Sequence, residues 1–150
     1  MTTRYHSLAP HEFYHIYNRG TEKRTIFLDD ADYRRFIESL YLSNSHYAVD
    51  IRHVRRTYSS VFSFDRNEPL VHIGAYCLMP NHFHILLTPA VENGIEKFML
   101  KLGTGYSMYF NKRYERTGAL YQGKFKSRHA NSDEYLKYLL AYIHLNPAKL

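Results

Sequence analysis

The chain has 150 residues, which is enough for one domain and too few for two separate cores, so we expect a single domain over residues 1–150. With 45% hydrophobic and 23% charged residues it is neither disordered nor collagen-like. Of the net charge of +6, residues 1–100 contribute nothing (11 basic, 11 acidic) and residues 101–150 contribute all of it (9 basic, 3 acidic). This basic last third predicts a polyanionic partner such as a nucleic acid, although a basic face kept for solubility is the alternative.

Membrane insertion and secretion are not expected. No apolar stretch approaches the roughly 20 residues of a spanning helix, and residues 1–13 lack an apolar signal segment, so a cytoplasmic protein is predicted. The single cysteine, Cys77, permits no internal disulfide. Any metal would therefore be held by His, Asn or carboxylate side chains.

The first half of the chain predicts a strand, a helix and an irregular segment. Residues 13–18 are rich in residues that favour strands. A helix capped by Asp29 or Asp30 follows, because apolar residues from Tyr33 to Tyr41 recur at helical spacing. Residues 44–69 mix polar and β-branched residues, and strand-like pieces around an extended loop are expected there.

Two strands, 71–79 and 81–88, are predicted around Pro80. In the first, period two predicts that Val71, Ile73, Ala75 and Cys77 share one face, which makes Cys77 a small core residue. In the second, Phe83, Ile85 and Leu87 point one way, and His82 and His84 point the other.

The remaining elements are a helix over 94–114, a strand over 124–130 and a last helix from Ser132 to just before Pro147. The order strand, helix, strand, strand, helix, strand, helix predicts an α+β fold, the ferredoxin-like split βαβ sandwich, with an additional C-terminal helix. Two helices would cover one face of its antiparallel sheet. His82 and His84 would lie on the other, open face.

His82 and His84 are the first candidate site. Two histidines two apart on a strand project side by side and could coordinate one metal ion, although two polar residues on a wet sheet face would give the same pattern. On the last helix, Tyr135, Tyr138, Tyr142 and Asn146 share one stripe. Core packing is the alternative explanation of this stripe, and it is preferred for Tyr135 and Tyr138.

Three ordered blocks carry a family resemblance: Met79-Pro80-Asn81-His82-Phe83-His84-Ile85-Leu86-Leu87, Gly118-Ala119-Leu120-Tyr121-Gln122-Gly123-Lys124-Phe125-Lys126-Ser127 and Tyr142-Ile143-His144-Leu145-Asn146-Pro147. They resemble the single-tyrosine transposases of the HUH endonuclease superfamily, and REP-associated tyrosine transposases in particular. Residues 44–69 lie outside the resemblance.

The resemblance implies a catalytic site. His82 and His84 match the histidine pair that binds a divalent metal, Mg²⁺ or Mn²⁺, and Tyr142 matches the nucleophile that forms a 5′-phosphotyrosine. Asn146 takes the position where related enzymes place a third metal ligand, a glutamine, whose side chain is one methylene longer. The implied activity is cleavage and rejoining of single-stranded DNA that contains hairpins, by a homodimer.

The basic last third supplies the predicted DNA path, because cations contact phosphates and aromatic rings stack on unpaired bases. The candidate DNA-binding residues are Arg19, Arg24, Lys112, Arg113, Tyr121, Lys124, Phe125, Lys126 and Arg128. Two other functions remain open from the sequence. One is a non-catalytic nucleic-acid-binding domain of the same fold, and the other is a metal-dependent nuclease that uses water as its nucleophile.

Overall fold

A computed structural model describes residues 8–145, and their side chains as far as residue 143. The regular elements, in chain order, are β1 (Phe13–Arg19), η1 (Thr21–Lys23), α1 (Asp30–Leu42), α2 (Ile51–Thr57), η2 (Val61–Ser63), β2 (Val71–Met79), β3 (His82–Pro89), α3 (Gly94–Arg113), β4 (Lys126–Ala130) and α4 (Asp133–Leu145). Among the described helices, none is long and apolar enough to cross a membrane.

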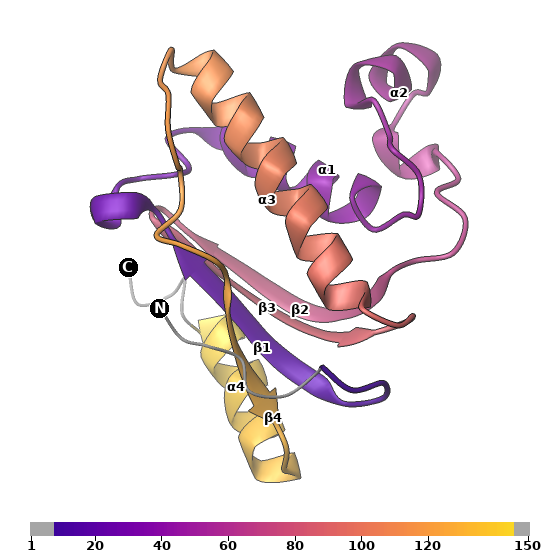
Figure 1. Cartoon of the computed structure of the whole chain (residues 1–150), viewed down its shortest axis with the longest axis vertical. Coiled ribbons are helices and arrows are strands. Elements are labelled where there is room, and N and C mark those ends of the chain that lie inside the picture. The colour runs from indigo at the N-terminus through magenta and orange to yellow at the C-terminus, as the bar shows by residue number, and fades with distance from the viewer. Residues whose placement is uncertain (1–7, 146–150) are drawn as a thin grey trace.

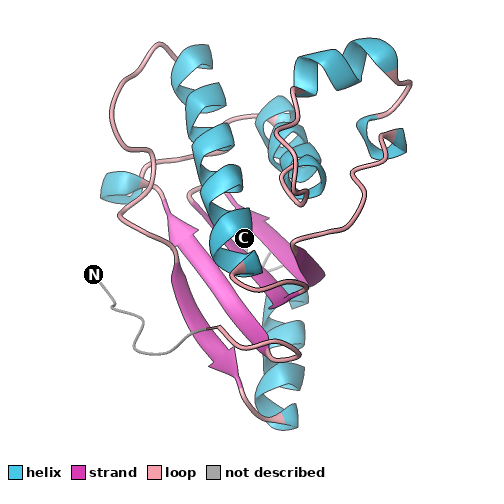
Figure 2. Cartoon of the chain, turned by 45° about the vertical axis from the view of Figure 1, so that its right-hand side comes forward, coloured by secondary structure: helices cyan, strands magenta, loops and turns pink. Residues whose placement is uncertain are grey.

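The four strands form one antiparallel sheet in the order β2-β3-β1-β4. Helices α1 and α3 cover one face of this sheet, and α4 lies against the other (Figure 1 and Figure 2). The predicted α+β fold of the ferredoxin-like type is therefore confirmed, including the additional C-terminal helix. One expectation is corrected: the face that carries the histidines is not open, because α4 packs on part of it.

The larger core lies between the sheet and the α1/α3 layer. Asp29 caps α1 by accepting a hydrogen bond from the Asp32 N–H, which fixes the start of the helix so that Phe36 and Leu40 point into this core. On β3, Phe83, Ile85 and Leu87 enter the same core, as their alternation predicts. His82 and His84 are thereby directed to the α4 side of the sheet.

A register shift in β2 contradicts one prediction. The pairing of β2 with β3 skips Gly74 between Ile73 and Ala75, which is a β-bulge. Because one extra residue reverses the side-chain alternation, Val71 packs in the α1/α3 core whereas Cys77 packs against α4. The four residues of the predicted stripe therefore do not share a face, although Cys77 is a buried core residue as expected.

Residues 44–69 contain helical turns rather than the predicted strand-like pieces. Asp50 caps α2 through the Arg52 N–H, and Ile51 and Val54 pack with Val61 in a small core of their own. Asn44 ties this segment to the sheet, because its side chain accepts hydrogen bonds from the N–H groups at 70 and 71 and donates one to the carbonyl at 71. The side chains that close this small core come from outside α2 and are irregularly spaced, so the periodicity of a single element does not reveal them.

Candidate functional site

Three histidines gather on the α4 side of the sheet. His82 and His84 lie two apart on β3, and their ring centroids are 5.1 Å apart. His15 comes from the neighbouring strand β1, where its Nε2 lies 2.8 Å from Nδ1 of His84. The central pairing of β1 with β3 thus joins the predicted histidine pair to a third imidazole.

Hydrogen bonds leave one nitrogen of each predicted ligand free. Nδ1 of His82 is 2.7 Å from Oδ1 of Asn81, which can only accept, so this nitrogen donates and Nε2 keeps its lone pair. Nδ1 of His84 shares a hydrogen bond with Nε2 of His15. Nε2 of His84 is buried and has no hydrogen-bond partner among residues 8–143. A buried polar atom without a partner is costly, which points to a ligand at this position.

Burial keeps these imidazoles uncharged at neutral pH. Burial, together with the nearby His15 and His82, lowers the pKa of His84 to about 4. Burial and the positive charge of Arg128 lower the pKa of His15 to about 4 as well, and burial lowers the pKa of His82. Metal ions bind neutral imidazole, so the pair is in the protonation state that a metal site requires.

Tyr142 lies beside this cluster. Helix α4 docks through Leu139 and Ile143, which pack with Cys77 and its neighbours on β2. This docking holds the ring of Tyr142 edge-on to the ring of His84, with 5.4 Å between centroids. The structure therefore brings together the three predicted site residues that it describes. Asn146, the fourth, lies outside the described residues.

A cavity of about 520 Å³ opens next to the histidines. Its wall includes His82 and His84, and three of its other lining residues are the cations Arg19, Lys23 and Lys126. The remaining lining residues are Tyr17, Asn18, Asn81 and Gln122. Neutral imidazoles surrounded by cations, with no carboxylate in the lining, form a site for an anion such as a phosphate group.

The described residues supply only part of a metal site. Within residues 8–145 no group of three or more His, Cys, Asp or Glu side chains is placed to hold a metal ion. The Nε2 atoms of His82 and His84 offer two donors, whereas Nε2 of His15 is already engaged. Two imidazoles fit a divalent cation whose other ligands come from outside this set, such as an amide, water or a phosphate oxygen.

Comparison with known proteins decides the family. The family model described as "Transposase IS200 like" matches residues 37–146 of the 150. The chain belongs to the IS200-like transposase family. This membership assigns it to a family of enzymes that act on DNA.

Solved structures agree with this family assignment at the level of the fold. A REP-associated tyrosine transposase bound to a REP hairpin superposes with a TM-score of 0.62 at 13% identity, over 99% of this chain and 74% of that one. A candidate transposase from Deinococcus radiodurans R1 superposes with a TM-score of 0.51 at 13% identity, over 96% and 95% of the two chains. No curated protein matches the sequence.

The predicted DNA-binding residues of this IS200-like transposase fall into two groups. Arg19 and Lys126 line the cavity at the histidines, and Arg24, Lys112 and Lys124 are exposed. The segment around Gln122 lies along β1, because the Gln122 N–H donates to the carbonyl at 19 and its side-chain oxygen accepts from Arg19 Nε. None of these five cations forms an ion pair within residues 8–143, so their charges are available to phosphates.

Four other candidates have structural contacts. Arg113 is held by the carboxylates of Asp29 and Asp32 at the start of α1. Tyr121 packs edge-on against Phe83, and its hydroxyl is buried without a partner among the described residues. The last two candidates are half-buried Phe125, which packs against the larger core, and Arg128, whose guanidinium lies 4.6 Å from the ring centre of Tyr135. Base stacking on Tyr121 would require this packing to open.

His15 is the site residue that the sequence analysis missed. The sequence predicts the strand at 13–18, and its alternation places His15 on the same side as Tyr17, but the pattern within this strand does not say that it lies next to His84. The split βαβ topology contains that information, since it makes β1 the neighbour of β3.

Proposed function

We propose that this protein cleaves and rejoins single-stranded DNA through a covalent 5′-phosphotyrosine at Tyr142, with a divalent metal at His82 and His84. The observation that carries the proposal is the contact between Tyr142 and His84, whose Nε2 is buried, uncharged and without a partner among the described residues. A metal ion held beside a nucleophile can activate both the nucleophile and the phosphodiester that it attacks.

His82 and His84 would hold the ion through their Nε2 atoms, and Asn146 would add an amide oxygen. Mg²⁺ or Mn²⁺ bound there would supply positive charge to a phosphate group, which lowers the cost of adding a nucleophile to it. Arg19, Lys23 and Lys126 around the same cavity would hold the DNA backbone on either side of the reacting group.

Tyr142 would perform the bond exchange. Its phenolic oxygen forms a new bond to phosphorus while the bond from phosphorus to the 3′ oxygen breaks; the tyrosine gives up its proton, and the released 3′ oxygen gains one as a hydroxyl. The phosphotyrosine ester retains the energy of the broken bond, so a 3′-hydroxyl of another strand can attack it and restore Tyr142. Strand transfer then needs no nucleotide cofactor.

Hairpin DNA is the proposed substrate. The solved relative described as a REP-associated tyrosine transposase is bound to a REP hairpin, and the exposed cations Arg24, Lys112 and Lys124 would extend the contact beyond the cavity. We further propose that the protein acts as a homodimer in the cytoplasm.

The experiment is incubation of the protein with Mn²⁺ and labelled single-stranded hairpin oligonucleotides taken from the DNA that flanks its gene. A covalent protein–DNA adduct on a denaturing gel is expected, and it should disappear in Tyr142→Phe. The matched control is Tyr138→Phe, which removes one hydroxyl from the same helix at an exposed ring stacked on Tyr142. This variant should retain the adduct.

Two outcomes would contradict the tyrosine mechanism. Cleavage without an adduct, unaffected by Tyr142→Phe, would show that water is the nucleophile. Tight binding without cleavage, across hairpins from both flanks, would show a nucleic-acid-binding protein without catalytic activity. An unchanged cleavage rate in the presence of a chelator would separately disprove the metal at His82 and His84.

A further inference from the structure

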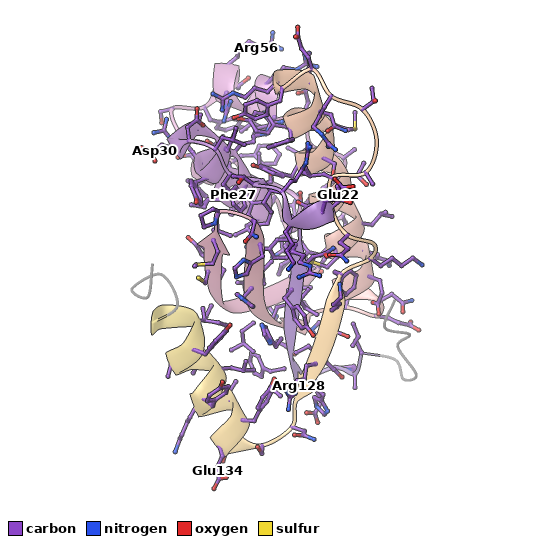
Figure 3. The ribbon with its side chains drawn as sticks, turned by 90° about the vertical axis from the view of Figure 1, so that its left-hand side faces the viewer. Glu22, Phe27, Asp30, Arg56, Arg128 and Glu134 are labelled. Atoms are coloured by element: carbon purple, nitrogen blue, oxygen red, sulfur yellow. The ribbon has the colours of Figure 1, made fainter. Side chains whose placement is uncertain are left out.

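A second cleft lies on the side of the sheet away from the histidines. It is formed by α1 and by residues 55–62, has a volume of about 770 Å³, and is larger than the cavity at His82 and His84. Figure 3 shows its setting: Arg56 on α2 and Asp30 at the start of α1 lie toward one end of the molecule, and Arg128 and Glu134 lie toward the other. The transposase chemistry proposed above makes no use of this cleft.

The cleft contains a cation without an anionic partner. Arg35 is half-buried in it and makes no ion pair or hydrogen bond through its guanidinium to the residues that the structure describes; its guanidinium carbon lies 4.9 Å from the ring centre of Tyr109. Burial and the nearby charge of Arg55 lower the pKa of Arg35, and the charge of Glu38 offsets this only in part. A half-buried cation close to a second cation attracts an anion.

The acidic residues around the cleft do not form an ion pair with Arg35 in the described part of the chain. Glu38 receives two hydrogen bonds from Arg55, of 3.0 and 3.1 Å, so both of its carboxylate oxygens are engaged and it forms no ion pair with Arg35 among the described residues. Asp30 lines the cleft, but no ion pair joins it to Arg34 or Arg35 in the described part of the chain. Arg34 and Arg35 are therefore available to an anion from outside.

Aromatic rings accompany these cations. Phe62 is 52% exposed although it is a large apolar residue, and Tyr58 is 38% exposed. Both line the cleft, and each is held in place by an edge-on ring beneath it, Tyr41 for Phe62 and Phe64 for Tyr58. Exposed rings of fixed orientation beside cations are the combination that binds unpaired nucleotides.

We propose that the cleft between α1 and residues 55–62 binds single-stranded DNA, with a phosphate group at Arg34 and Arg35 and a base stacked on Phe62 or Tyr58. A strand fits better than a free nucleotide, because the exposed Arg56 on α2, which has no ion pair in the part of the chain that the structure describes, adds positive charge outside the lining of the cleft. The site would hold DNA on the opposite side of the sheet from Tyr142, and its binding does not depend on cleavage.

The test uses the absence of tryptophan from the chain. Phe62→Trp places a single indole in the cleft, and Tyr47→Trp places one on an exposed ring outside it. Both proteins are titrated with a short oligothymidylate in the presence of a chelator, while total binding is followed by fluorescence anisotropy of a label on the DNA. Stacking of a base should quench the indole of the Phe62→Trp protein and leave that of the Tyr47→Trp protein unchanged.

The charge contribution is tested in the Phe62→Trp protein. Adding Arg35→Gln should weaken the binding reported by the indole at position 62 about tenfold and reduce the slope of log affinity against log salt by about 0.7, the value for one phosphate contact of a single strand. Lys97→Gln, which removes one exposed charge from α3 outside the cleft, should change neither quantity.

Two results would overturn the proposal. If anisotropy shows saturated DNA binding and the indole at position 62 is not quenched, DNA does not enter the cleft. If thymidine monophosphate quenches this indole at the same concentrations as the oligothymidylate, the site binds a free nucleotide rather than a strand.

Discussion

His15 on β1 shares a hydrogen bond of 2.8 Å with His84 on β3, from Nε2 of the first to Nδ1 of the second. Both rings are buried, and one of the two nitrogens must donate, so this contact couples the tautomer of His84 to that of His15. When Nδ1 of His84 is the donor, its buried Nε2 keeps a lone pair that can bind a metal ion. His15 is therefore a positioning residue for the proposed metal ligand.

Replacing His15 with Ala should weaken Mn²⁺ binding roughly 10–100-fold, the range found when a partner of a metal-ligating histidine is removed. Titration of free Mn²⁺ by electron paramagnetic resonance measures this directly and needs no DNA. His15→Gln, which keeps a hydrogen-bond acceptor, should recover part of the affinity. The control is His129→Ala, on β4, whose imidazole contacts Glu12 instead. Equal affinity in wild type and His15→Ala would contradict this role.

Much of the fold was predictable because the core-forming residues follow local patterns. Helix α1 is recognisable from its capping residue Asp29 and its apolar stripe. Strand β3 is recognisable from the alternation of Phe83, Ile85 and Leu87. The order of the helices and strands along the chain then predicts the ferredoxin-like topology. The pair His82 and His84 could be placed on the correct face for the same reason.

The parts that could not be predicted depend on long-range contacts. The bulge at Gly74 is a property of the pairing of β2 with β3, and the short helix α2 packs on Val61 and Leu42, which lie outside the helix itself. In the same way, Arg113 looks like a DNA contact in the sequence, whereas its partners Asp29 and Asp32 lie far away along the chain. The sequence shows which residues are charged, but it does not show which of them form ion pairs in the folded protein.

The strand β4 and the segment before it should contribute phosphate contacts. Lys124→Ala combined with Lys126→Ala should reduce the slope of log affinity against log salt by about 1.4, since each phosphate contact of single-stranded DNA contributes about 0.7. Affinity of a labelled hairpin oligonucleotide measured over a series of salt concentrations gives the slope. Lys97→Ala, on the exposed side of α3, should leave it unchanged. An unaltered slope in the double variant would place the DNA on another surface.

Arg113 should contribute to stability rather than to DNA binding. Its guanidinium bonds to Asp29 and to the fully buried carboxylate of Asp32, which also accepts hydrogen bonds from Tyr109 and Tyr114. Removing the cation leaves the buried negative charge of Asp32 without its ion-pair partner. Arg113→Ala should therefore lower the melting temperature by several degrees, measured by circular dichroism.

The neighbouring Lys112 is the control for Arg113. It is exposed and has no ion pair in the described part of the chain, so Lys112→Ala should leave the melting temperature within about one degree of the wild type. If Arg113→Ala instead melts like the wild type and weakens DNA binding, the ion pairs with α1 are not its main role.

The docking of α4 is measurable through Cys77. This thiol is buried between β2 and α4, beside Leu139, and burial raises its pKa, so that it contains even less of the reactive thiolate near pH 8 than an exposed cysteine. We expect slow reaction with a thiol reagent in the native protein and fast reaction in urea. Because only an opening of this core exposes the sulfur, the native rate reports how often α4 leaves the sheet.

Leu139→Ala removes part of the contact that holds α4 and should raise the native labelling rate of Cys77 at least about tenfold, since a buried Leu to Ala change typically costs about 2–5 kcal/mol. The matched control is Leu102→Ala in the α1/α3 core on the opposite face of the sheet. If labelling requires only α4 to open, the Leu102 variant should lower global stability yet accelerate labelling much less than the Leu139 variant. Equal acceleration by both variants would mean that Cys77 becomes accessible only on complete unfolding, and that α4, with Tyr142, does not move independently of the sheet.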